Sequence, residues 1–403
     1  MLNPPMADDE QIRQIHAQAA SLAIAITGGG SLAIGQLLAV PGGSRTLLEA
    51  VVPYSAAALR EYLKAPPEQY CSPRAARAMA MTAYQRALRL SASGSVDATR
   101  RTLIGVGCTA SLVSDRAKQG PHRIHLAWQT AGETHTRSLE LAKGRRTRRG
   151  EEELAAALVL DSIAMAVGIC ERTPLSLLEI ERVQEHRTTA SAAWRRLLAG
   201  ETSIVSAHPP KELGDLASDR ATARDGTGPE LNRVHRAIFP GSFNPRHAGH
   251  RKMAEIAERR LGLPVEHEIS IENVDKPPLN FTEMADAAAQ FSGDETLWFT
   301  RSATFIEKSA IFPRSTFIVG ADTLARLADP RYYGGSSQSA AAAIETLVTA
   351  GCRFLIFGRT SDQEFRTLAE LPIPNSLKSI CQQVPETEFR VDISSTQMRA
   401  TSA

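Results

Sequence analysis

The sequence predicts an α/β protein built from two domains. With 403 residues, the chain has the length of two to three domains at roughly 150 residues each. Hydrophobic residues make up 43% of it, which is enough to bury sizeable cores. In both halves, short apolar runs lead into glycine-containing turns and then into helical spacing, as in alternating strands and helices. We place the first domain at residues 1–170, a helical segment and linker at 171–232, and the second domain at 233–403.

Charge and cysteine content narrow the class of protein. Lysine and arginine total 46 against 44 for aspartate and glutamate, and the net charge of +2 is too balanced to indicate a nucleic-acid partner. We interpret the basic run 143–149 as a solvated loop, with phosphate or RNA contact as the alternative. The five cysteines are scattered without a Cys-x-x-Cys pair, no apolar run approaches the ~18 residues of a membrane span, and the first residues lack a signal-peptide pattern. We therefore expect a cytoplasmic protein without a nucleic-acid or membrane partner and without a metal bound by its own side chains.

The first domain is expected to begin with an apolar strand at residues 22–26, followed by the turn Thr27-Gly-Gly-Gly-Ser31 and an apolar helix. Further strands are expected at 103–107 and 125–128. The rest of the series is Val40-Pro-Gly-Gly-Ser44, Val51-Val-Pro-Tyr-Ser55 and the run 71–80. Together these segments resemble the C-terminal domain of the CinA (competence-damage-inducible) family over roughly residues 8–170. The resemblance implies an α/β fold, and many members of that family are nicotinamide mononucleotide deamidases.

The glycine turn departs from that family's pattern at the residues that carry the chemistry. The family motif Glu-Ser-Cys-Thr-Gly-Gly has a serine nucleophile, and here Thr27 stands at its position with Ile26 in place of the glutamate. The family's Tyr-Ser-Asn-x-x-Lys reads Tyr54-Ser-Ala-Ala-Ala-Leu59, so the lysine is replaced as well. Because a hydroxyl nucleophile needs a neighbouring base or charge, these changes disfavour amide hydrolysis. Thr27, Gly28 and Gly29 would then form a vestigial amidase site, a phosphate-binding loop, or part of a structural or regulatory domain.

Residues 171–232 have a mixed character. Apolar residues between positions 177 and 198 recur at helical spacing, which predicts a helix. Residues 206–230 are rich in Asp, Gly, Pro and Ala and short of aromatics, which indicates a linker or mobile loop.

The second domain contains the most informative segment of the chain, Phe239-Pro-Gly-Ser-Phe-Asn-Pro-Arg-His-Ala-Gly-His250. A short strand at 237–239 leads into a tight turn, and a helix is expected to run on to about residue 261. The first N–H groups of a helix are unpaired and lie at the positive end of its dipole, so they can bind an anion. His247 and His250 share a helix face and can both reach a phosphate there. A zinc site and ordinary surface histidines are the alternatives.

This segment resembles the signature of the nucleotidyltransferase superfamily with a His-x-Gly-His motif. Its Gly-Ser-Phe-Asn-Pro part looks most like the nicotinamide or nicotinate mononucleotide adenylyltransferases. The resemblance implies a Rossmann-like parallel sheet that binds ATP. It assigns nucleotide contacts to the turn residues Gly241, Ser242, Phe243 and Asn244.

Three later segments are similar to further elements of that family. An apolar strand ends at Gly320-Ala-Asp322, where the family has Gly-x-Asp near the nucleotide, although Asp322 could instead cap the next helix. The strand 353–357 precedes Arg359, an arginine that the family often has, although a solvated loop side chain is equally compatible. Asp392-Ile-Ser-Ser-Thr-Gln-Met-Arg399 resembles the family's Ile-Ser-Ser-Thr-x-Ile-Arg element, in which hydroxyls, helix N–H groups and a guanidinium hold phosphate oxygens. A plain helix cap is the alternative there. The nucleotide contacts expected from these segments are Gly320, Asp322, Arg359, Ser394, Ser395 and Thr396.

The resemblance also implies a mechanism. The acceptor's own phosphate attacks the α-phosphorus of ATP and pyrophosphate leaves, so positioning and charge stabilisation dominate catalysis. His247 and His250 would donate hydrogen bonds to the α- or β-phosphate, and Arg399 would hold the leaving phosphates, which makes these three the expected catalytic residues. Mg²⁺ would be held mainly by the nucleotide phosphates.

Substrate choice depends on weaker signals. Lys276 and Trp298 are candidate contacts to the acceptor, with a solvated loop lysine and a core tryptophan as the alternatives. Nicotinamide or nicotinate mononucleotide is the expected small-molecule acceptor. Another phosphorylated acceptor, or a sensor that binds nucleotides of NAD metabolism without fast turnover, are the other hypotheses. We also expect a homo-oligomer.

Overall fold

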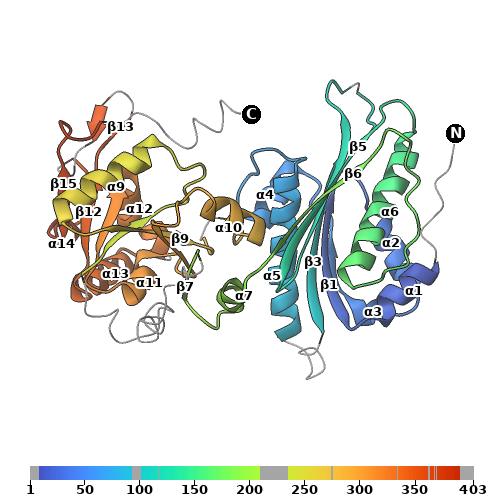
Figure 1. Ribbon diagram of the computed structural model, residues 1–403, viewed down its shortest axis with the longest axis horizontal. Helices are drawn as coiled ribbons and strands as arrows, with labels where there is room; N and C mark the ends of the chain where they lie inside the picture. Colours follow the sequence, from blue (N-terminus) through green and yellow to red (C-terminus); the bar gives the residue numbers. More distant parts are fainter. Residues whose placement is uncertain are drawn as a thin grey trace. The chain divides into compact units, whose positions relative to one another are not determined.

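The computed structural model describes residues 9–92, 101–116, 118–208, 235–273, 276–333, 335–361, 364–366, 368 and 370–390. The chain forms two compact units (Figure 1). The N-terminal unit comprises Met1–Arg195 and Asp275–Glu283, and the C-terminal unit comprises Arg196–Val274 and Met284–Ala403. The N-terminal unit thus continues past residue 170 and takes in a short segment from the second half of the sequence.

A six-stranded mixed sheet forms the centre of the N-terminal unit. Its strands, in the spatial order β2-β1-β3-β4-β5-β6, are β2 (Leu47–Val51), β1 (Ala20–Thr27), β3 (Thr102–Ser111), β4 (His122–Gln129), β5 (Glu133–Leu141) and β6 (Val183–Thr189). β1 runs parallel to both of its neighbours, and the strands from β3 to β6 pair antiparallel. The helices are α1 (Asp9–Ala17), α2 (Leu32–Ala39), α3 (Gly43–Thr46), α4 (Ala56–Leu63), α5 (Pro73–Ala92), α6 (Arg148–Ala166) and α7 (Ala192–Ala199), the last of which contains the boundary between the units.

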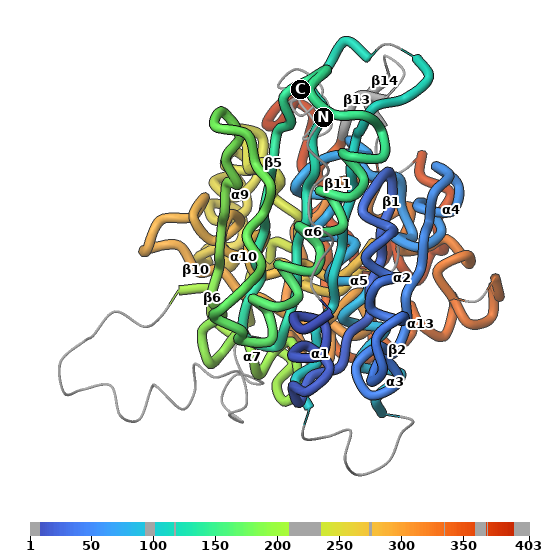
Figure 2. The backbone as a smooth tube through the Cα atoms, turned by 90° about the vertical axis from the view of Figure 1, so that its right-hand side faces the viewer, coloured from blue at the N-terminus to red at the C-terminus, as the bar shows by residue number. Residues whose placement is uncertain are grey.

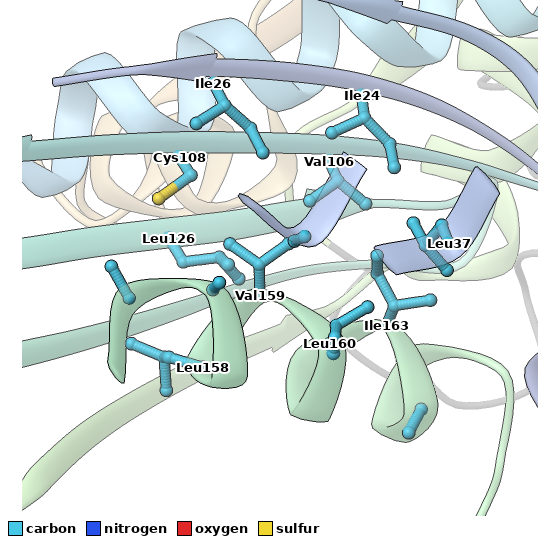
Figure 3. Close-up of a cluster of buried hydrophobic side chains, with 14 of the residues drawn as sticks. Ile24, Ile26, Leu37, Val106, Cys108, Leu126, Leu158, Val159, Leu160 and Ile163 are labelled. Atoms are coloured by element: carbon cyan, nitrogen blue, oxygen red, sulfur yellow. The ribbon is translucent and has the colours of Figure 1, made fainter. Parts of the chain in front are cut away.

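Helices cover both faces of this sheet, and β1 is therefore buried along its whole length. α5 packs on one face, whereas α6 and α2 pack on the other. Figure 2 shows α6 lying over the sheet between β1 and β5. In the close-up of Figure 3, Ile24 and Ile26 of β1 and Val106 of β3 face Val159 and Ile163 of α6.

The close packing of α5 on β3 depends on two glycines. A Cβ atom on Gly107 would lie 2.5 Å from the backbone nitrogen of Ala80 and would overlap the carbonyl oxygen of Ala76. A Cβ atom on Gly105 would overlap the backbone of α5 at Tyr84. Glycine in the strand and alanine along the buried face of the helix therefore let the two backbones approach each other.

The helix expected between residues 177 and 198 forms only from Ala192 onward, as α7. Val183–Thr189 is instead the edge strand β6, paired antiparallel with β5 from Val183↔Leu139 to Thr189↔Glu133. The expectation of a helix there is wrong because the free edge of β5 supplies hydrogen-bond partners, and such tertiary pairing overrides local helical spacing. Residues 209–234, most of the expected linker, lie outside the described residues.

The segment Asp275–Glu283 is anchored in the N-terminal unit by buried side chains. Phe281 has no exposed surface, and its N–H donates to the hydroxyl of Thr134 at 3.0 Å. The hydroxyl groups of Thr282 and Thr188 lie 3.0 Å apart. Phe281 is therefore buried within the N-terminal unit, where its ring stacks on Trp194, although it is encoded beyond β9 of the C-terminal unit.

A seven-stranded sheet forms the centre of the C-terminal unit, in the spatial order β15-β12-β11-β8-β9-β10-β7. The strands are β15 (Cys381–Val384), β12 (Arg353–Phe357), β11 (Thr316–Gly320), β8 (Ala237–Pro240), β9 (Val265–Ser270), β10 (Thr296–Thr300) and β7 (Ile204–Ser206). All pairings are parallel except that of β7 with β10. A separate hairpin consists of β13 (Arg359–Ser361) and β14 (Glu364–Arg366). The helices are α9 (Ala248–Leu261), α10 (Phe281–Ala288), α11 (Phe305–Ile311), α12 (Ala321–Ala328), α13 (Ser337–Thr349), α14 (Asn375–Lys378) and the 3₁₀ helix η2 (Pro330–Tyr333); α10 contains the second boundary between the units.

The two-domain α/β class predicted from the sequence is confirmed. Apolar strands that are buried on both faces, such as β11 and β12, lie where continuous apolar runs predicted them. Ile238, Phe317 and Phe354 of adjacent strands pack with Leu324 of α12 and Ile344 of α13 in one core. In the part of the chain that the structure describes, no helix is both long enough and apolar enough to cross a membrane.

Candidate active site

The strand order of the C-terminal sheet defines where a ligand can bind. β8 lies beside β11 in parallel register, with Ala237 opposite Thr316 and Ile238 opposite Phe317, and β9 lies on its other side. Apart from the edge strand β7, chain order runs outward from β8 in both directions, so the connections after β8 and β11 diverge at their carboxyl ends. In doubly wound sheets this topological switch point forms the ligand crevice. It brings the turn after β8 and the Gly320-Ala-Asp322 segment, predicted from separate parts of the sequence, to the same edge.

The turn after β8 is built around a buried phenylalanine. The Phe243 ring is 1% exposed and meets the rings of Phe239, His250 and Phe291 edge-on, with centroid distances of 5.3, 5.1 and 5.4 Å. Its φ of +41° is left-handed, a conformation that costs a non-glycine residue about 1–2 kcal/mol and that burial of the ring offsets. A Cβ atom on Gly241 would lie 2.8 Å from Cζ of Phe243, so glycine leaves room for this ring. Ser242 and Asn244 are exposed on the turn, whereas the side chain of Phe243 is buried beneath it.

His247 and His250 form a stacked pair at the start of α9. His247 is the N-cap, and its Nδ1 accepts the N–H of Gly249 at 3.1 Å. Nδ1 of His250 accepts the N–H of His247 at 3.2 Å, and the two ring centroids lie 3.8 Å apart at an angle of 24°. Because both Nδ1 atoms are acceptors, each neutral ring carries its proton on Nε2. The pair thus presents two Nε2–H donors at a helix N-terminus, as phosphate binding requires.

Burial lowers the pKa of His250 to about 3, and the nearby charges of His247 and Arg246 lower it further. His250 is therefore a neutral donor at pH 7 in the ligand-free protein. Both Nδ1 atoms already accept backbone N–H groups, an arrangement that suits hydrogen bonding through Nε2–H. Among the described residues, no group of three side chains that could hold a metal ion occurs.

At the other rim, α12 begins directly after β11. Its N-cap is Gly320, with φ −78° and ψ 157°, and the exposed Asp322 stands within the first helical turn. The alternative in which Asp322 caps this helix is therefore wrong, because the chain turns into the helix two residues earlier. Gly320 and Asp322 both remain at the switch-point edge, as the nucleotide contact requires.

The structure separates the remaining candidates from this pair. Trp298 is 7% exposed, its indole N–H donates to Glu266 at 2.6 Å, and the guanidinium of Arg236 lies 5.4 Å from the ring centroid, which favours the core alternative. Lys276 is exposed in the segment that belongs to the N-terminal unit. Arg359 begins β13, but its side chain is not described. The last expected contacts, Ser394, Ser395, Thr396 and Arg399, lie outside the described residues.

Sequence reasoning missed the residues that hold the histidine turn from the side. Arg246 pairs with Glu295, and Gln290 bonds both ends of the segment from Phe243 to Arg246. Arg246 directly precedes the first histidine of the His-x-Gly-His motif, which was the one local signal. Its partners lie 44 and 49 residues further along the chain.

The glycine turn of the N-terminal unit is closed by a carboxylate of its own chain. Glu152 of α6 accepts hydrogen bonds from the hydroxyl of Ser31 at 3.0 Å and from the N–H of Leu32 at 3.3 Å. Arg148 donates to Glu152 at 3.1 Å and to the carbonyl of Gly28 at 3.2 Å. Burial raises the pKa of Glu152, but these hydrogen bonds outweigh burial and lower the pKa overall. An internal anion therefore occupies the helix start where a phosphate would bind.

A cavity of about 550 Å³ opens beside this turn, and Gly28, Tyr54, Ser114, Asp115, Lys118 and Arg148 are among its lining residues. Thr27 is 8% exposed at the end of β1, and Gly28, with φ +78°, lies so close to β3 that a Cβ atom would overlap the carbonyl oxygen of Ala110. Gly29 would place a Cβ atom against Leu112. The two glycines therefore serve close packing of the turn on β3.

The C-terminal unit is thus a doubly wound α/β domain with a strand–turn–helix element at its switch point, where the histidine pair stands at the start of α9. Comparison with known proteins places it more narrowly. Residues 238–401 match the family model described as cytidylyltransferase-like, so the C-terminal half carries a domain of the nucleotidyltransferase superfamily. No curated protein matches the chain. Among solved structures, the chain is similar to the competence/damage inducible protein CihA from Agrobacterium tumefaciens, with 19% identity and a TM-score of 0.31, over 42% of this chain and 100% of that one.

Proposed function

We propose that the C-terminal unit is an adenylyltransferase that moves AMP from ATP to nicotinamide or nicotinate mononucleotide and releases pyrophosphate. The observation that carries this proposal is the stacked pair of histidines, whose Nδ1 atoms are both engaged at the start of α9. The family match supports nucleotidyl transfer in general. The choice of acceptor comes from the Gly-Ser-Phe-Asn-Pro turn, which resembles that of the mononucleotide adenylyltransferases.

The reaction needs no nucleophile from the protein. A phosphate oxygen of the acceptor attacks the α-phosphorus of ATP, the bond to the bridging oxygen breaks, and pyrophosphate leaves with that oxygen. His247 and His250 donate through Nε2–H to non-bridging phosphate oxygens, where negative charge grows in the transition state. The N-terminus of α9 adds the positive end of its dipole. Ser394, Ser395, Thr396 and Arg399 would hold the leaving phosphates.

Mg²⁺ supplies charge neutralisation when it accompanies the triphosphate. The donor groups of the turn are imidazole N–H and backbone N–H groups, which suit phosphate oxygens and cannot ligate a cation. We therefore expect the ion to be held mainly by the nucleotide, with the carboxylate of Asp322, in the first turn of α12, at the adjoining edge of the sheet.

Pyrophosphate release by the full chain with ATP, Mg²⁺ and each mononucleotide tests this proposal. His250→Ala should lower kcat by about 10²- to 10³-fold, the usual effect of removing one such donor. His235→Ala is the matched control: this exposed histidine precedes β8, at the opposite edge of the sheet, and bonds to Thr316. Equal rates for the wild type and His250→Ala would refute the assignment.

The acceptor is identified by a panel in which each compound is tested singly. Release with nicotinamide or nicotinate mononucleotide alone would support the proposal, whereas release with another phosphorylated compound would redefine the acceptor. CTP replaces ATP in one series, because the matching family model is described as cytidylyltransferase-like. Binding of mononucleotides without release from any acceptor would support the sensor hypothesis instead.

For the N-terminal unit we propose a role without amide hydrolysis. Glu152 fills the helix start of the glycine turn, and Ile26 and Thr27 stand where the CinA-like pattern has glutamate and serine. Release of ammonia from nicotinamide mononucleotide by the full chain, lost in Thr27→Val, would overturn this proposal.

A further inference from the structure

The side chain of Gln290 bridges the histidine turn. Its Nε2 donates to the carbonyl oxygen of Phe243 at 3.0 Å, and its Oε1 accepts the backbone N–H of Arg246 at 2.7 Å. The amide group of Gln290 thus fixes the distance between Phe243, whose ring packs against His250, and Arg246, which directly precedes His247. Both backbone groups would otherwise need water or another partner.

The side chain of Arg246 is locked by a second set of contacts. Its Nη1 donates to Glu295 Oε2 at 2.9 Å and to the carbonyl of Gln290 at 3.2 Å, and its Nη2 pairs with the other carboxylate oxygen. The guanidinium lies 4.3 Å from the ring centroid of Phe291. Only 7% of the Arg246 side chain is exposed. The hydrogen bond from Arg246 lowers the pKa of Glu295 to about 2, so the ion pair persists across the working pH range.

These contacts reach the histidine pair through aromatic packing. Phe291, which carries the guanidinium on one face, meets Phe243 edge-on at 5.4 Å, and Phe243 meets His250 edge-on at 5.1 Å. Arg246 is also covalently adjacent to His247, whose N–H holds Nδ1 of His250. Movement of Arg246 therefore shifts both partners of that hydrogen bond.

We propose that Arg246, clamped by Glu295, Gln290 and Phe291, is a positioning residue that keeps His247 and His250 in the Nε2–H form and aimed at the phosphate site. The clamp does not touch the substrate and acts through the two rings. This inference rests on the proposed function for its catalytic consequence, but the state of the rings can be measured without turnover.

The test uses Arg246→Lys, which keeps the charge but loses the planar fork, and Glu295→Gln, which keeps the shape but loses the charge. ¹⁵N NMR of the histidine rings in the ligand-free full chain shows which nitrogen carries the proton. We expect Nε2–H in the wild type and a mixture of tautomers in Arg246→Lys. In these clamp variants, the kcat for pyrophosphate release should fall about 10- to 100-fold, while the KM for ATP changes by less than about threefold. The reason is that the variants lose the alignment of the histidine rings and keep the groups that bind ATP.

Glu388→Gln provides the matched control. Arg260, in the last turn of α9, pairs with Glu388 through two nitrogens much as Arg246 pairs with Glu295, but at the far end of the helix. This control should leave both the tautomers and kcat unchanged. Should Arg246→Lys unfold, Gln290→Ala tests the same clamp through the backbone bridge and is expected to give the same mixture.

The outcomes separate the clamp from the proposed function. Clamp variants that keep the wild-type tautomer and kcat would overturn the clamp, even in an active adenylyltransferase. A changed tautomer in a protein that releases no pyrophosphate with any acceptor would support the clamp and reject the proposed function. A change of tautomer in Glu388→Gln as large as in Arg246→Lys would also overturn the clamp, because the effect would then not be specific to Arg246.

Discussion

Gly241→Ala should loosen the histidine turn by displacing one ring. The added Cβ would stand 2.8 Å from Cζ of Phe243, and ordinary contact begins at 3.4 Å, so the ring must move by at least about 0.6 Å. The ring cannot rotate away freely, because it is 1% exposed and enclosed by Phe239, His250 and Phe291. Overpacking of this kind costs about 1–3 kcal/mol.

Amide hydrogen exchange in peptides that cover β8 and α9 measures this cost locally. A loss of 1–3 kcal/mol should accelerate exchange of their core amides about 5- to 150-fold, since each 1.4 kcal/mol is a factor of ten. The kcat for pyrophosphate release should fall with it, because His250 rests on the displaced ring. Wild-type exchange rates in Gly241→Ala would show that the packing described for Phe243 is incorrect.

Gly320→Ala is the comparison at the opposite rim of the switch point. A Cβ there meets no atom within 4 Å, and φ of −78° suits alanine, so its stability should stay within about 1 kcal/mol of the wild type. If ATP phosphates approach this backbone, Gly320→Ala should raise KM for ATP without faster exchange. The two substitutions thus separate damage to the turn from obstruction of the ligand.

Two further predictions concern pH and packing. Burial lowers the pKa of His267 to about 4, with Arg246 adding to the effect, below the ~6.5 of an unfolded histidine; its contribution to stability is therefore complete above pH 6.5 and is lost as pH falls towards 4. Between pH 7 and pH 4.5, the free energy of unfolding measured in urea should therefore fall by ~2 kcal/mol less in His267→Leu than in the wild type. Parallel curves of this free energy against pH would contradict the lowered pKa of His267. Gly107→Ala, whose Cβ would overlap the carbonyl oxygen of Ala76 in α5, should destabilise the N-terminal unit by about 3 kcal/mol. Gly35→Ala in α2, where a Cβ meets nothing within 4 Å, should instead stabilise by up to about 1 kcal/mol, and similar melting shifts for the two would argue against close packing of α5 on β3.

Features encoded locally were predictable from the sequence. The apolar runs that became β8, β11 and β12 and the turn-to-helix transition at His247 depend on residues within a few positions of one another. Their side-chain periodicity and turn residues specify strand or helix directly. The parallel sheet followed from the family resemblance of these segments, and its ligand edge from the general position of binding sites at the carboxyl ends of parallel strands.

Features that depend on distant partners were not predictable in this way. Helical spacing indicated a helix across β6, because the free edge of β5 cannot be seen from residues 183–189. From the sequence, Trp298 was compatible with a ligand contact or with the core. The contacts that decide for the core come from Glu266, in β9, and from Arg236, which directly precedes β8. The clamp on Arg246 needs Gln290 and Glu295, which only the fold brings near. Contacts between residues this far apart in the chain leave no local pattern in a single sequence.

The anchoring of Phe281 in the N-terminal unit has a consequence for synthesis on the ribosome. Translation must pass Glu283 before the core beside Thr134 can close, and by then β8, α9 and β9 of the other unit have already been made. Most chains mature domain by domain from the amino end, with each domain finished before the next begins. Here the contacts of Phe281 with Thr134 and Trp194 can form only after most of the first unit and part of the second have been made, so the two units acquire their native contacts in an interleaved order.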